Sequence, residues 1–451
     1  MIGALGVRRL CAGVLAVTLL AGLLGANRPD ASGPLFSAGL LGNATTLLPV
    51  APQDARGLAY LSGSTVLRLP DGRLRYLPRG ASTPVTVAPD DPGALAAAAS
   101  ERAWLAAGKV PGRGHAERDA AARSLLFLRL LLRPGGAAVA AQPAYWAYVW
   151  PRDASFVAAA FEATGHHAES RAILGFLART QQPDGTWPAR SRPDGTPVAD
   201  GRAPQLDAPG WVCWAAWLAS DQGDDRAEAR RLWPTVRAAA DAAVRSLGRG
   251  GLPRPGADYW ERAEPAPTLG NAAALLVGLH AAARLAGAVQ PSAQDRYLRA
   301  AERLDRAVRR RLGGPDGYHH STTGGGADAA VTWLAPPFRP PDPALRAAVA
   351  DAARQLAAGP DGGVVPGWPW RGADPWTPAT ASFALAEMAA GEHAAAARRL
   401  GWLLDHRTAL GAFPERVRHG DGAPRSVAPI GWTHALVLLT LVSQERPLPI
   451  P

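Results

Sequence analysis

The sequence predicts a mainly α-helical protein built as an (α/α)6 barrel, a ring of six helical hairpins, with a small β segment on its N-terminal side. Alanine-rich stretches with the period of an amphipathic helix fill the chain after Pro92. The connections between these stretches alternate between short and long. With 451 residues, of which 47% are hydrophobic, the chain is long and apolar enough for one large core.

The first residues have the pattern of an export signal. Arg8 and Arg9 precede an apolar run over 10–26, and polar residues follow it. A basic start and an apolar run without a polar face predict a signal peptide or an uncleaved signal anchor over 1–27. No small-residue cleavage site follows the run, and Cys11 precedes it, whereas a lipoprotein cysteine would follow it. We therefore expect an extracytoplasmic protein, either secreted or anchored to the cell membrane by this segment.

Residues 33–90 differ from the rest of the chain and predict a small β-rich segment. Short strand-like runs lie at 58–60, 65–69 and 74–77. Pro70-Asp71-Gly72 supplies a turn between two of these runs. The segment is too short to bury a full core of its own.

The remaining chain is predicted to be helical, with a linker helix region at 91–115 and a catalytic domain at 116–446. Twelve helical stretches are expected in that domain, at 116–133, 152–164, 166–181, 209–221, 225–247, 268–286, 291–312, 326–335, 344–358, 377–390, 392–408 and 430–444. The connections after the odd-numbered stretches are mostly long, and those after the even-numbered stretches mostly short. Successive antiparallel helices point in opposite directions, so every second connection lies at the same end. All the long loops should therefore share one face, where functional residues are expected.

Tryptophan and carboxylate residues gather in these long loops. Nine of the fifteen tryptophans lie in or beside them: Trp146, Trp150, Trp187, Trp211, Trp260, Trp368, Trp370, Trp376 and Trp432. The loop carboxylates are Asp153, Asp207, Glu261, Asp374 and Glu415. Tryptophan commonly belongs to the core, but flat indole faces also suit the apolar faces of sugar rings. The alternation of tryptophans with carboxylates around one rim indicates a carbohydrate cleft.

Glycosidic cleavage needs a carboxylic acid that protonates the leaving oxygen and a second carboxylate on the opposite face of the sugar. Glu261 and Glu415 lie in distant loops of the predicted ring, each between a loop and a helix. The pattern alone does not select these two among the loop acids. By itself it favours simpler interpretations, a first-turn glutamate near a helix dipole for Glu261 and a solvated loop acid for Glu415.

Five segments of this chain occur in the order known from one enzyme family. The most specific are Trp150-Pro151-Arg152-Asp153, Asp258-Tyr259-Trp260-Glu261, and Phe413-Pro414-Glu415 followed by Gly431-Trp432-Thr433-His434-Ala435. Gln205-Leu206-Asp207 and Asp374-Pro375-Trp376 are weaker members of the series. Together they resemble the Trp-x-Arg-Asp, Trp-Glu and Pro-Glu…Trp-Ser/Thr-His-Ala motifs of the glucoamylase family, glycoside hydrolase family 15. The resemblance covers residues 116–445, nearly all of the helical part.

The resemblance implies that Glu261 is the general acid and Glu415 the general base of an inverting hydrolase. It implies substrate-binding roles for Trp150, Arg152, Asp153, Asp207, Trp260, Arg371, Trp376 and Trp432. Arg152 and Asp153 would hold hydroxyl groups of the sugar at the non-reducing end, with Trp150 and Trp260 as walls of that subsite. A structural interpretation of Asp153, as a helix N-cap, is compatible with this role. His434 receives no catalytic role.

The activity implied is exo-acting hydrolysis of α-glucosidic bonds, of the glucoamylase, glucodextranase or trehalase kind, on an oligosaccharide or polysaccharide of α-linked glucose. The sequence departs from the family at three places. Arg262 replaces the second glutamate of fungal members, and the sugar-binding arginine has no clear counterpart except Arg371 in a shortened loop. The large N-terminal β-sandwich of the family is reduced to the short β segment.

Two other classes fit parts of the sequence. The segment Gln181-Gln182-Pro183-Asp184-Gly185-Thr186-Trp187 resembles the Gln…Gly-x-Trp motif of terpene cyclases, but it occurs once and no Asp-rich protonating motif follows. A non-catalytic carbohydrate-binding envelope protein on the same fold would have lost the carboxylates, whereas both persist here. A binding assay without turnover would favour that alternative.

Charge and cysteine content exclude further classes. The net charge of +10 comes from arginines spread among Ala, Asp and Glu along helix faces, with no basic block interleaved with aromatic residues, so we expect no nucleic-acid partner. Cys213 stands alone beyond the signal segment, which leaves no disulfide framework. The pairs His166-His167 and His319-His320 lack helical ligand spacing and are interpreted as polar loop residues, so no metal is expected. We likewise expect no cofactor, and no membrane contact except through the N-terminal anchor.

Overall fold

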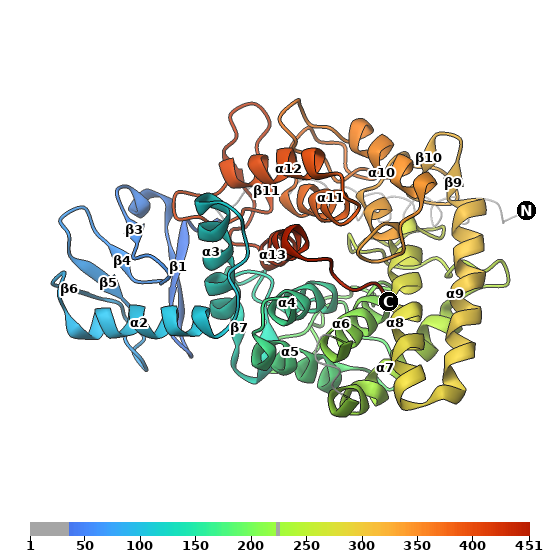
Figure 1. Ribbon diagram of the computed structural model, residues 1–451, viewed down its shortest axis with the longest axis horizontal. Helices are drawn as coiled ribbons and strands as arrows, with labels where there is room; N and C mark the ends of the chain where they lie inside the picture. The colour runs from blue at the N-terminus through green and yellow to red at the C-terminus, as the bar shows by residue number, and fades with distance from the viewer. Residues whose placement is uncertain (1–35, 222–225) are drawn as a thin grey trace, which may run out of the picture. The chain divides into compact units, whose positions relative to one another are not determined.

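The computed structural model describes residues 36–221 and 226–451, and Phe36–Pro451 form one compact unit. The predicted signal segment at 1–27 lies outside the described residues. The described chain contains a β-rich part followed by a ring of helices (Figure 1).

The β-rich part consists of two antiparallel sheets. One pairs β1 (Gly39–Gly42) with β2 (Leu47–Val50), and the other has the order β3 (Ala59–Tyr60), β4 (Leu67–Arg68), β5 (Leu74–Tyr76) and β6 (Val85–Val87). Strands β3 to β5 coincide with the three predicted runs, and Gly72 has the positive φ of 86° that its turn requires. Strands β1, β2 and β6 were not predicted: β1 and β2 lack polar–apolar alternation, and β6 alternates over only three residues.

This part packs against the helical ring. Helix α2 (Pro92–Ala107) begins after Asp91, whose carboxylate accepts a hydrogen bond from the Ala94 N–H at 2.8 Å. Arg123 of α3 (His115–Leu131) lies 3.8 Å above the ring centroid of Tyr60 and donates a 2.8 Å hydrogen bond to the Ser64 carbonyl. A short β segment without a full core of its own thus covers its apolar side with a helix of the ring.

Six elements form the inner ring, and six helices surround them. The inner elements are α4 (Pro151–Ala163), α6 (Ala208–Asp221), α8 (Leu269–Val289), the 3-10 helix η3 (Ala329–Leu334), α11 (Thr377–Ala389) and α13 (Gly431–Glu445). The outer helices are α3 (His115–Leu131), α5 (His167–Thr180), α7 (Arg226–Ser246), α9 (Pro291–Arg311), α10 (Pro343–Gln355) and α12 (His393–Asp405). Each inner element contacts the next one in this order, and α13 contacts α4, which closes the ring (Figure 1). The (α/α)6 prediction is confirmed.

Burial explains which helices lie inside. Every residue of α4 is buried, whereas α9 buries only the apolar stripe that includes Tyr297, Leu304 and Val308. Small residues let the inner helices approach closely. A Cβ on Gly278 of α8 would lie 2.4 Å from the Cα of Gly210 in α6. Helix α8 is also long and apolar enough to cross a membrane, but most of it is buried within this ring.

One predicted helix is wrong in type. The stretch at 326–335 is not an α-helix but the six-residue 3-10 helix η3. It begins at Asp328, whose side chain accepts from the Ala330 N–H, and Pro336 and Pro337 follow its end closely. Proline cannot donate the next helical hydrogen bond, so the element stays short. It still occupies one position of the inner ring.

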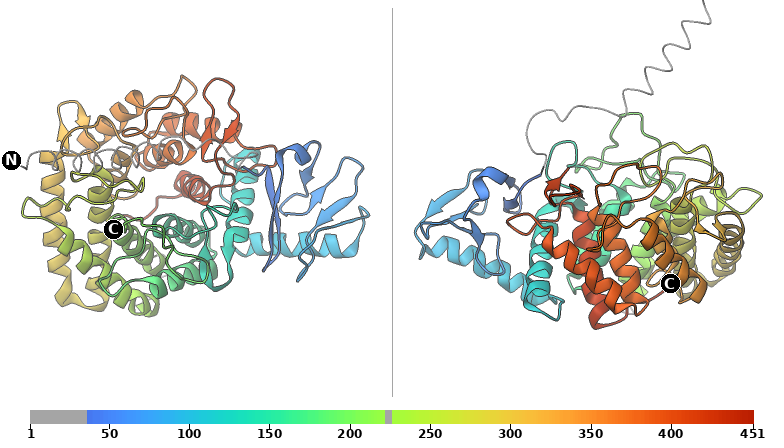
Figure 2. Two further views of the ribbon diagram at one scale, coloured as in Figure 1. Left: turned by 180° about the vertical axis from the view of Figure 1, so that it is seen from behind. Right: turned by 90° about the horizontal axis from the view of Figure 1, so that it is seen from above.

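The six long loops lie together at one end of the ring (Figure 2), as predicted. Short hairpins occur within three of them: β7 (Leu132–Arg133) with β8 (Ala137–Ala138), β9 (Gly313–Gly314) with β10 (Gly317–Tyr318), and β11 (Arg416–Val417) with β12 (Pro424–Arg425). Backbone pairing joins each loop to the next: Val149 with Ser191, Gln205 with Ala257, Thr268 with Ser321, Asp328 with Gly367, Trp376 with Arg416, and Gly431 with Ala140. These contacts form a closed belt, which we call the loop belt.

Candidate active site

Glu261 and Glu415 come from opposite sides of the loop belt. Glu261 lies in the loop before α8, and Glu415 in the loop before α13. In the ring, two inner elements separate α8 from α13 in either direction, by α6 and α4 or by η3 and α11. Two carboxylates can therefore face a ligand from opposite sides of the mouth.

A tight turn presents Glu261. The buried carboxylate of Asp258 accepts hydrogen bonds from the N–H groups of Trp260 and Arg262, both at 3.0 Å. The Glu261 N–H donates to the Asp258 carbonyl at 2.9 Å. These bonds hold the Glu261 backbone at a φ of 61°, in the left-handed region that non-glycine residues seldom adopt.

Three side chains hold the carboxylate of Glu261. The indole N–H of Trp150 donates to Oε1 at 2.6 Å, and Gln205 donates to the same oxygen at 3.3 Å. Arg202 forms an ion pair with Oε2. The side chain of Trp150, which the motifs place as a wall of the sugar subsite, is 6% exposed, and its indole N–H holds Glu261.

Glu415 lies in a more enclosed setting. Ser426 donates a hydrogen bond to its Oε2, and the nearest cation, Arg416, has its Nε 3.9 Å from that oxygen. Burial raises the pKa of Glu415, and the charge of Asp153 adds to the rise, whereas Ser426 and Arg416 lower it. The site thus contains one ion-paired carboxylate and one desolvated carboxylate.

His434 anchors the segment that carries Glu415. Its Nε2 accepts a 3.2 Å hydrogen bond from the Phe413 N–H, and its Nδ1 lies 2.9 Å from the Ser124 hydroxyl. Burial lowers the pKa of His434 to about 3, so the ring is neutral. This agrees with the absence of a catalytic role for His434 in the sequence interpretation.

Backbone strain coincides with both carboxylates. Among the described residues, the two non-glycine residues with positive φ are Glu261 and Ser426, the latter with a φ of 66°. One is a proposed catalytic residue, and the other holds the second proposed catalytic residue. Left-handed non-glycine residues cost free energy and tend to occur where function requires a fixed side-chain direction.

Arg152 is the centre of a buried polar group on the first turn of α4. It contacts Asp153 at 3.1 Å and Asp207 at 3.2 Å, and it donates to the Tyr259 carbonyl at 2.9 Å. Burial raises the pKa of Asp153 and of Asp207, while the charge of Arg152 opposes the rise. Asp153 does not cap α4, because Trp150 occupies the N-cap position. The structure brings these three predicted residues together.

Several polar atoms of this group have no hydrogen-bond partner within the described chain. They are Arg152 Nε, Asp207 Oδ1, Trp260 Nε1 and Trp432 Nε1. Buried polar atoms without partners are costly and are uncommon in folded proteins. Donors and acceptors of this kind are suited to the hydroxyl groups of a ligand.

Aromatic residues connect the two sides of the site. Trp376 packs edge-on against Trp260, with ring centroids 5.2 Å apart, and Arg416 lies 5.3 Å from the Trp376 centroid. The guanidinium of Arg152 lies 4.6 Å above the ring of Trp432. The predicted residues Trp260, Trp376 and Trp432 therefore belong to one site.

Other loop residues lie farther out or are structural. Arg371 is exposed and rests on Trp368 at 5.1 Å, and no described contact joins it to the carboxylates. Trp368 and Trp370 are each 37% exposed, and Tyr145, which was not predicted, is 77% exposed. Asp374 accepts hydrogen bonds from the His419 N–H and from Arg425, both at 2.9 Å, so it holds the β11–β12 hairpin.

Two of the nine loop tryptophans are core residues, which corrects their interpretation as cleft residues. Trp211 is fully buried among Trp214, Trp333 and Phe338 inside the ring. Trp187 is also buried, and its indole N–H donates to the Leu177 carbonyl. The large side chain of Trp211 fills space between the inner elements of the ring.

The segment that resembles a terpene-cyclase motif has a structural role. Gln181 donates to the carbonyls of Gly185 and Thr235, which joins the end of α5 to α7. Gly185 has a φ of 84°, and a Cβ there would lie 2.1 Å from the Ala238 carbonyl oxygen. The motif therefore fastens a helix end, and its resemblance does not indicate cyclase chemistry.

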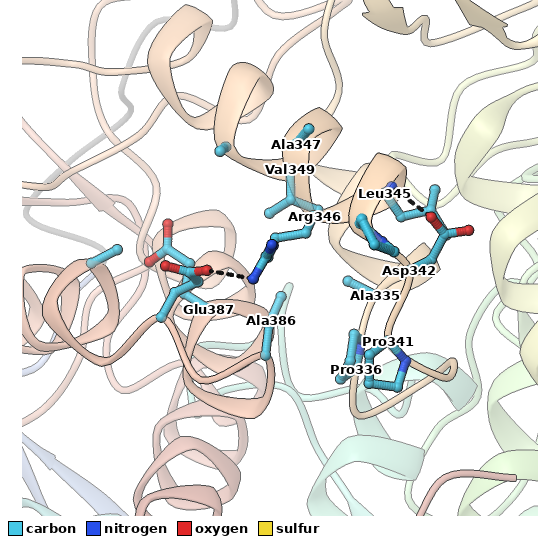
Figure 3. Close-up of a pocket in the computed structure, with 15 residues that line it drawn as sticks. Ala335, Pro336, Pro341, Asp342, Leu345, Arg346, Ala347, Val349, Ala386 and Glu387 are labelled. Carbon is cyan, nitrogen blue, oxygen red and sulfur yellow. Dashed lines mark hydrogen bonds and ion pairs between the residues drawn. The ribbon is translucent and has the colours of Figure 1, made fainter.

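Two further features lie outside the carboxylate pair. Asp258, Glu264 and His320 place three potential metal-ligand atoms within 4.8 Å of one another. His320 lies in a loop, as predicted, and its side chain is fully buried. A pocket of about 590 Å³, lined by Ala335, Asp342, Arg346 and Glu387 among others, lies between α10 and α11 (Figure 3) and includes none of the predicted site residues.

Solved structures share this fold. A glycosidase variant solved in complex with glucose has a TM-score of 0.64 and 23% identity, over 72% of this chain and 96% of that one. A bacterial glucoamylase complexed with acarbose has a TM-score of 0.59 and 17% identity, over 80% of this chain and 62% of that one. A rhamnosidase from Klebsiella oxytoca with rhamnose bound has a TM-score of 0.59 and 18% identity, over 73% of this chain and 64% of that one. At these identities, the likeness establishes a glucoamylase-like (α/α)6 fold.

Sequence comparison adds one short match. No family model matches the chain. A 121-residue segment is 29% identical to an uncharacterized glycosyl hydrolase of Methanocaldococcus jannaschii. The match spans 26% of this chain and 19% of the length of that relative.

Proposed function

We propose that the protein is an inverting, exo-acting glycoside hydrolase that cleaves α-glucosidic bonds, with Glu261 as general acid and Glu415 as general base. The observation that carries the proposal is the pair of carboxylates on opposite sides of the loop belt, each next to a strained backbone position. The fold shared with glycosidases and the partial sequence match to a glycosyl hydrolase support it.

In this mechanism Glu261 protonates the glycosidic oxygen, and Glu415 removes a proton from a water that attacks the opposite face of the sugar. Such a mechanism needs about 6.5–9.5 Å between the carboxyl groups, so that the water fits between the sugar and the base. Arg202 occupies Oε2 of Glu261 and must release it when a leaving group binds. Glu415 stays held by Ser426, which leaves Oε1 for the water.

The polar group around Arg152 is suited to the terminal sugar. Its unpartnered donors and acceptors lie beside aromatic residues, the combination that sugar rings with many hydroxyl groups require. Trp368, Trp370 and Tyr145 at the exposed rim would contact further sugar units. We infer an oligosaccharide or polysaccharide of α-linked glucose as the substrate.

Product stereochemistry tests the proposal directly. The purified protein is incubated with maltose, isomaltose, trehalose and an α-rhamnoside, and the anomer released first is observed by proton NMR. We expect β-glucose from at least one α-glucoside. Initial α-glucose would overturn the assignment of Glu415 as base, and binding without turnover across the panel would favour the carbohydrate-binding alternative.

The site of action is also proposed, from Arg8, Arg9 and the apolar run at 10–26. We propose that the helical domain works outside the cytoplasmic membrane, either secreted or anchored by this segment. Cell fractionation tests it. Recovery of the full-length protein from the cytosol with its N-terminus intact would contradict this location.

A further inference from the structure

The cluster of Asp258, Glu264 and His320 lies behind the turn that presents Glu261. Asp258 and Glu264 belong to the loop before α8, and His320 to the loop before η3. The Nε2 of His320 is 3.9 Å from Asp258 Oδ2 and 3.7 Å from Glu264 Oε1. Asp258 and His320 have no exposed side-chain surface, and Glu264 is 12% exposed.

A fourth residue fixes the orientation of the histidine. Asp328 Oδ2 lies 2.7 Å from His320 Nδ1, while Asp328 Oδ1 accepts from the Tyr259 hydroxyl and the Ala330 N–H. A carboxylate only accepts hydrogen bonds, so Nδ1 carries the proton in this pair. When the imidazole is neutral, its lone pair is then on Nε2, directed at the two other carboxylates.

The three converging atoms are all acceptors. Asp258 Oδ2 and His320 Nε2 are buried and have no hydrogen-bond partner within the described chain. The other oxygen of Asp258 already accepts two backbone N–H groups. The nearest cation is Arg262, with its Nε 3.8 Å from Glu264 Oε1. Acceptors facing one another in a buried space repel unless a positive group lies between them.

We propose that Asp258, Glu264 and His320 bind a divalent transition-metal ion of the Zn²⁺ type. One imidazole and two carboxylates are a ligand set that such ions accept, with water completing the coordination. Ligands about 2.1 Å from a tetrahedral metal are about 3.4 Å apart. The 3.7 Å and 3.9 Å from His320 Nε2 require a small inward movement, and the two carboxylates offer oxygens within 4.8 Å of each other. The carboxylate of Asp328 on the far nitrogen is the outer-shell partner that metal-bound histidines usually have.

The metal would hold the turn that carries Glu261. Asp258 contributes one oxygen to the metal and the other to the N–H groups of Trp260 and Arg262, so the ion and the turn share one carboxylate. His320 comes from the adjacent loop, so the ion would cross-link two segments of the loop belt. It would not contact the reacting bond, and the three ligands are positioning residues.

Binding of metal can be measured without any sugar. The full protein is dialysed against a chelator and titrated with ZnCl₂ by calorimetry and by thermal unfolding, with MnCl₂ and CaCl₂ in parallel. We expect one Zn²⁺ per chain and a rise in melting temperature of about 3 °C or more at saturating metal. We expect Ca²⁺, which prefers six or more oxygen ligands, to bind far more weakly. Failure of every ion to bind would overturn the proposal and would indicate a protonated His320 with a buried water.

Variants distinguish the loss of the metal site from a general loss of stability. His320→Gln should abolish the metal-dependent rise in melting temperature, and the matched variant His319→Gln, one residue away and outside the cluster, should keep it. Asp328→Asn leaves all three ligands in place and should weaken Zn²⁺ binding about 10-fold to 100-fold through the outer shell. Equal Zn²⁺ binding by His320→Gln and wild type would overturn the site. These results are independent of the proposed hydrolase activity, which can fail while the metal binds.

Discussion

The two sides of the loop belt surround the same chemical group in different ways. Glu261 sits on a strained turn, its carboxylate paired with Arg202 and partly open to solvent. Glu415 is largely buried, held by a serine hydroxyl, and its pKa is raised by burial. The comparison shows that environment, not residue type, distinguishes the two carboxylates. Arg202 favours the charged form of Glu261, and burial favours the neutral form of Glu415, so the assignment of Glu261 as acid and Glu415 as base requires that the bound substrate displaces Arg202.

Substitution of each carboxylate by its amide is expected to have the largest effect. Glu261→Gln should reduce hydrolysis of a natural disaccharide about a hundredfold or more, yet spare much of the activity on an α-glucosyl fluoride, whose leaving group needs little protonation. Glu415→Gln should reduce both, because water must be activated whichever group leaves. Steady-state kinetics on the two substrates measure the difference. Wild-type activity in both variants would end the enzyme hypothesis at these residues.

The hydroxyl of Ser426 offers a test of the Glu415 side alone. Ser426→Ala removes the hydrogen bond that lowers the pKa of Glu415, so the pKa should rise further. The base is active when ionised, so activity on the acidic side of the profile should fall about tenfold while the plateau at higher pH changes little. The pH dependence of kcat measures this shift. An unchanged acidic limb would show that Glu415 is not the base.

The ion pair of Arg202 tests the Glu261 side. Arg202→Gln removes the cation that pairs with Glu261 and that a leaving group has to displace from Oε2. The kcat/KM for a disaccharide should rise roughly threefold, a modest effect because the pair is partly exposed. Arg262→Gln is a suitable control, since Arg262 contacts Glu264 and not Glu261. Identical kinetics for Arg202→Gln and Arg262→Gln would show that Arg202 does not act on Glu261.

The smallest expected effect concerns the backbone at Glu261. Glu261→Gly and Glu261→Ala both lose the carboxylate. At a φ of 61° alanine pays the steric cost of a Cβ, whereas glycine does not. The glycine variant should be more stable by about 1 kcal/mol, measured by urea unfolding under equal conditions. Equal free energies of unfolding for the two variants would mean that the turn relaxes, and that backbone strain at Glu261 does not distinguish it from Glu415.

The sequence predicted the helical architecture well because it depends on local properties. Alanine content and helical period located the helices, and alternating loop lengths placed the long loops at one end, where the loop belt closes. The failures have physical reasons. η3 is too short for its period to be distinctive, and Trp187 and Trp211 lie beside loops in the sequence while their side chains point into the core.

The site was predicted only in part. Motifs located Arg152, Asp153, Asp207 and both glutamates, but no motif indicated Arg202, Ser426 or Tyr145. A serine before Val427 or an arginine after Gly201 is ordinary in a loop, and only proximity to a carboxylate gives either residue a role. Arg371 rests on the exposed Trp368, and its sugar-binding role stays a prediction.

By itself, the sequence determined the ring, the face that carries the loops, and the acids available on that face, because helix period and loop length are properties of neighbouring residues. Tertiary structure alone decided which partner each acid has. Trp150 and Glu261 are joined by a hydrogen bond across two loops, and Asp258 meets His320 across two others. Such contacts depend on how the ring closes, and closure brings together residues whose separation in the chain carries no signal of their distance in space.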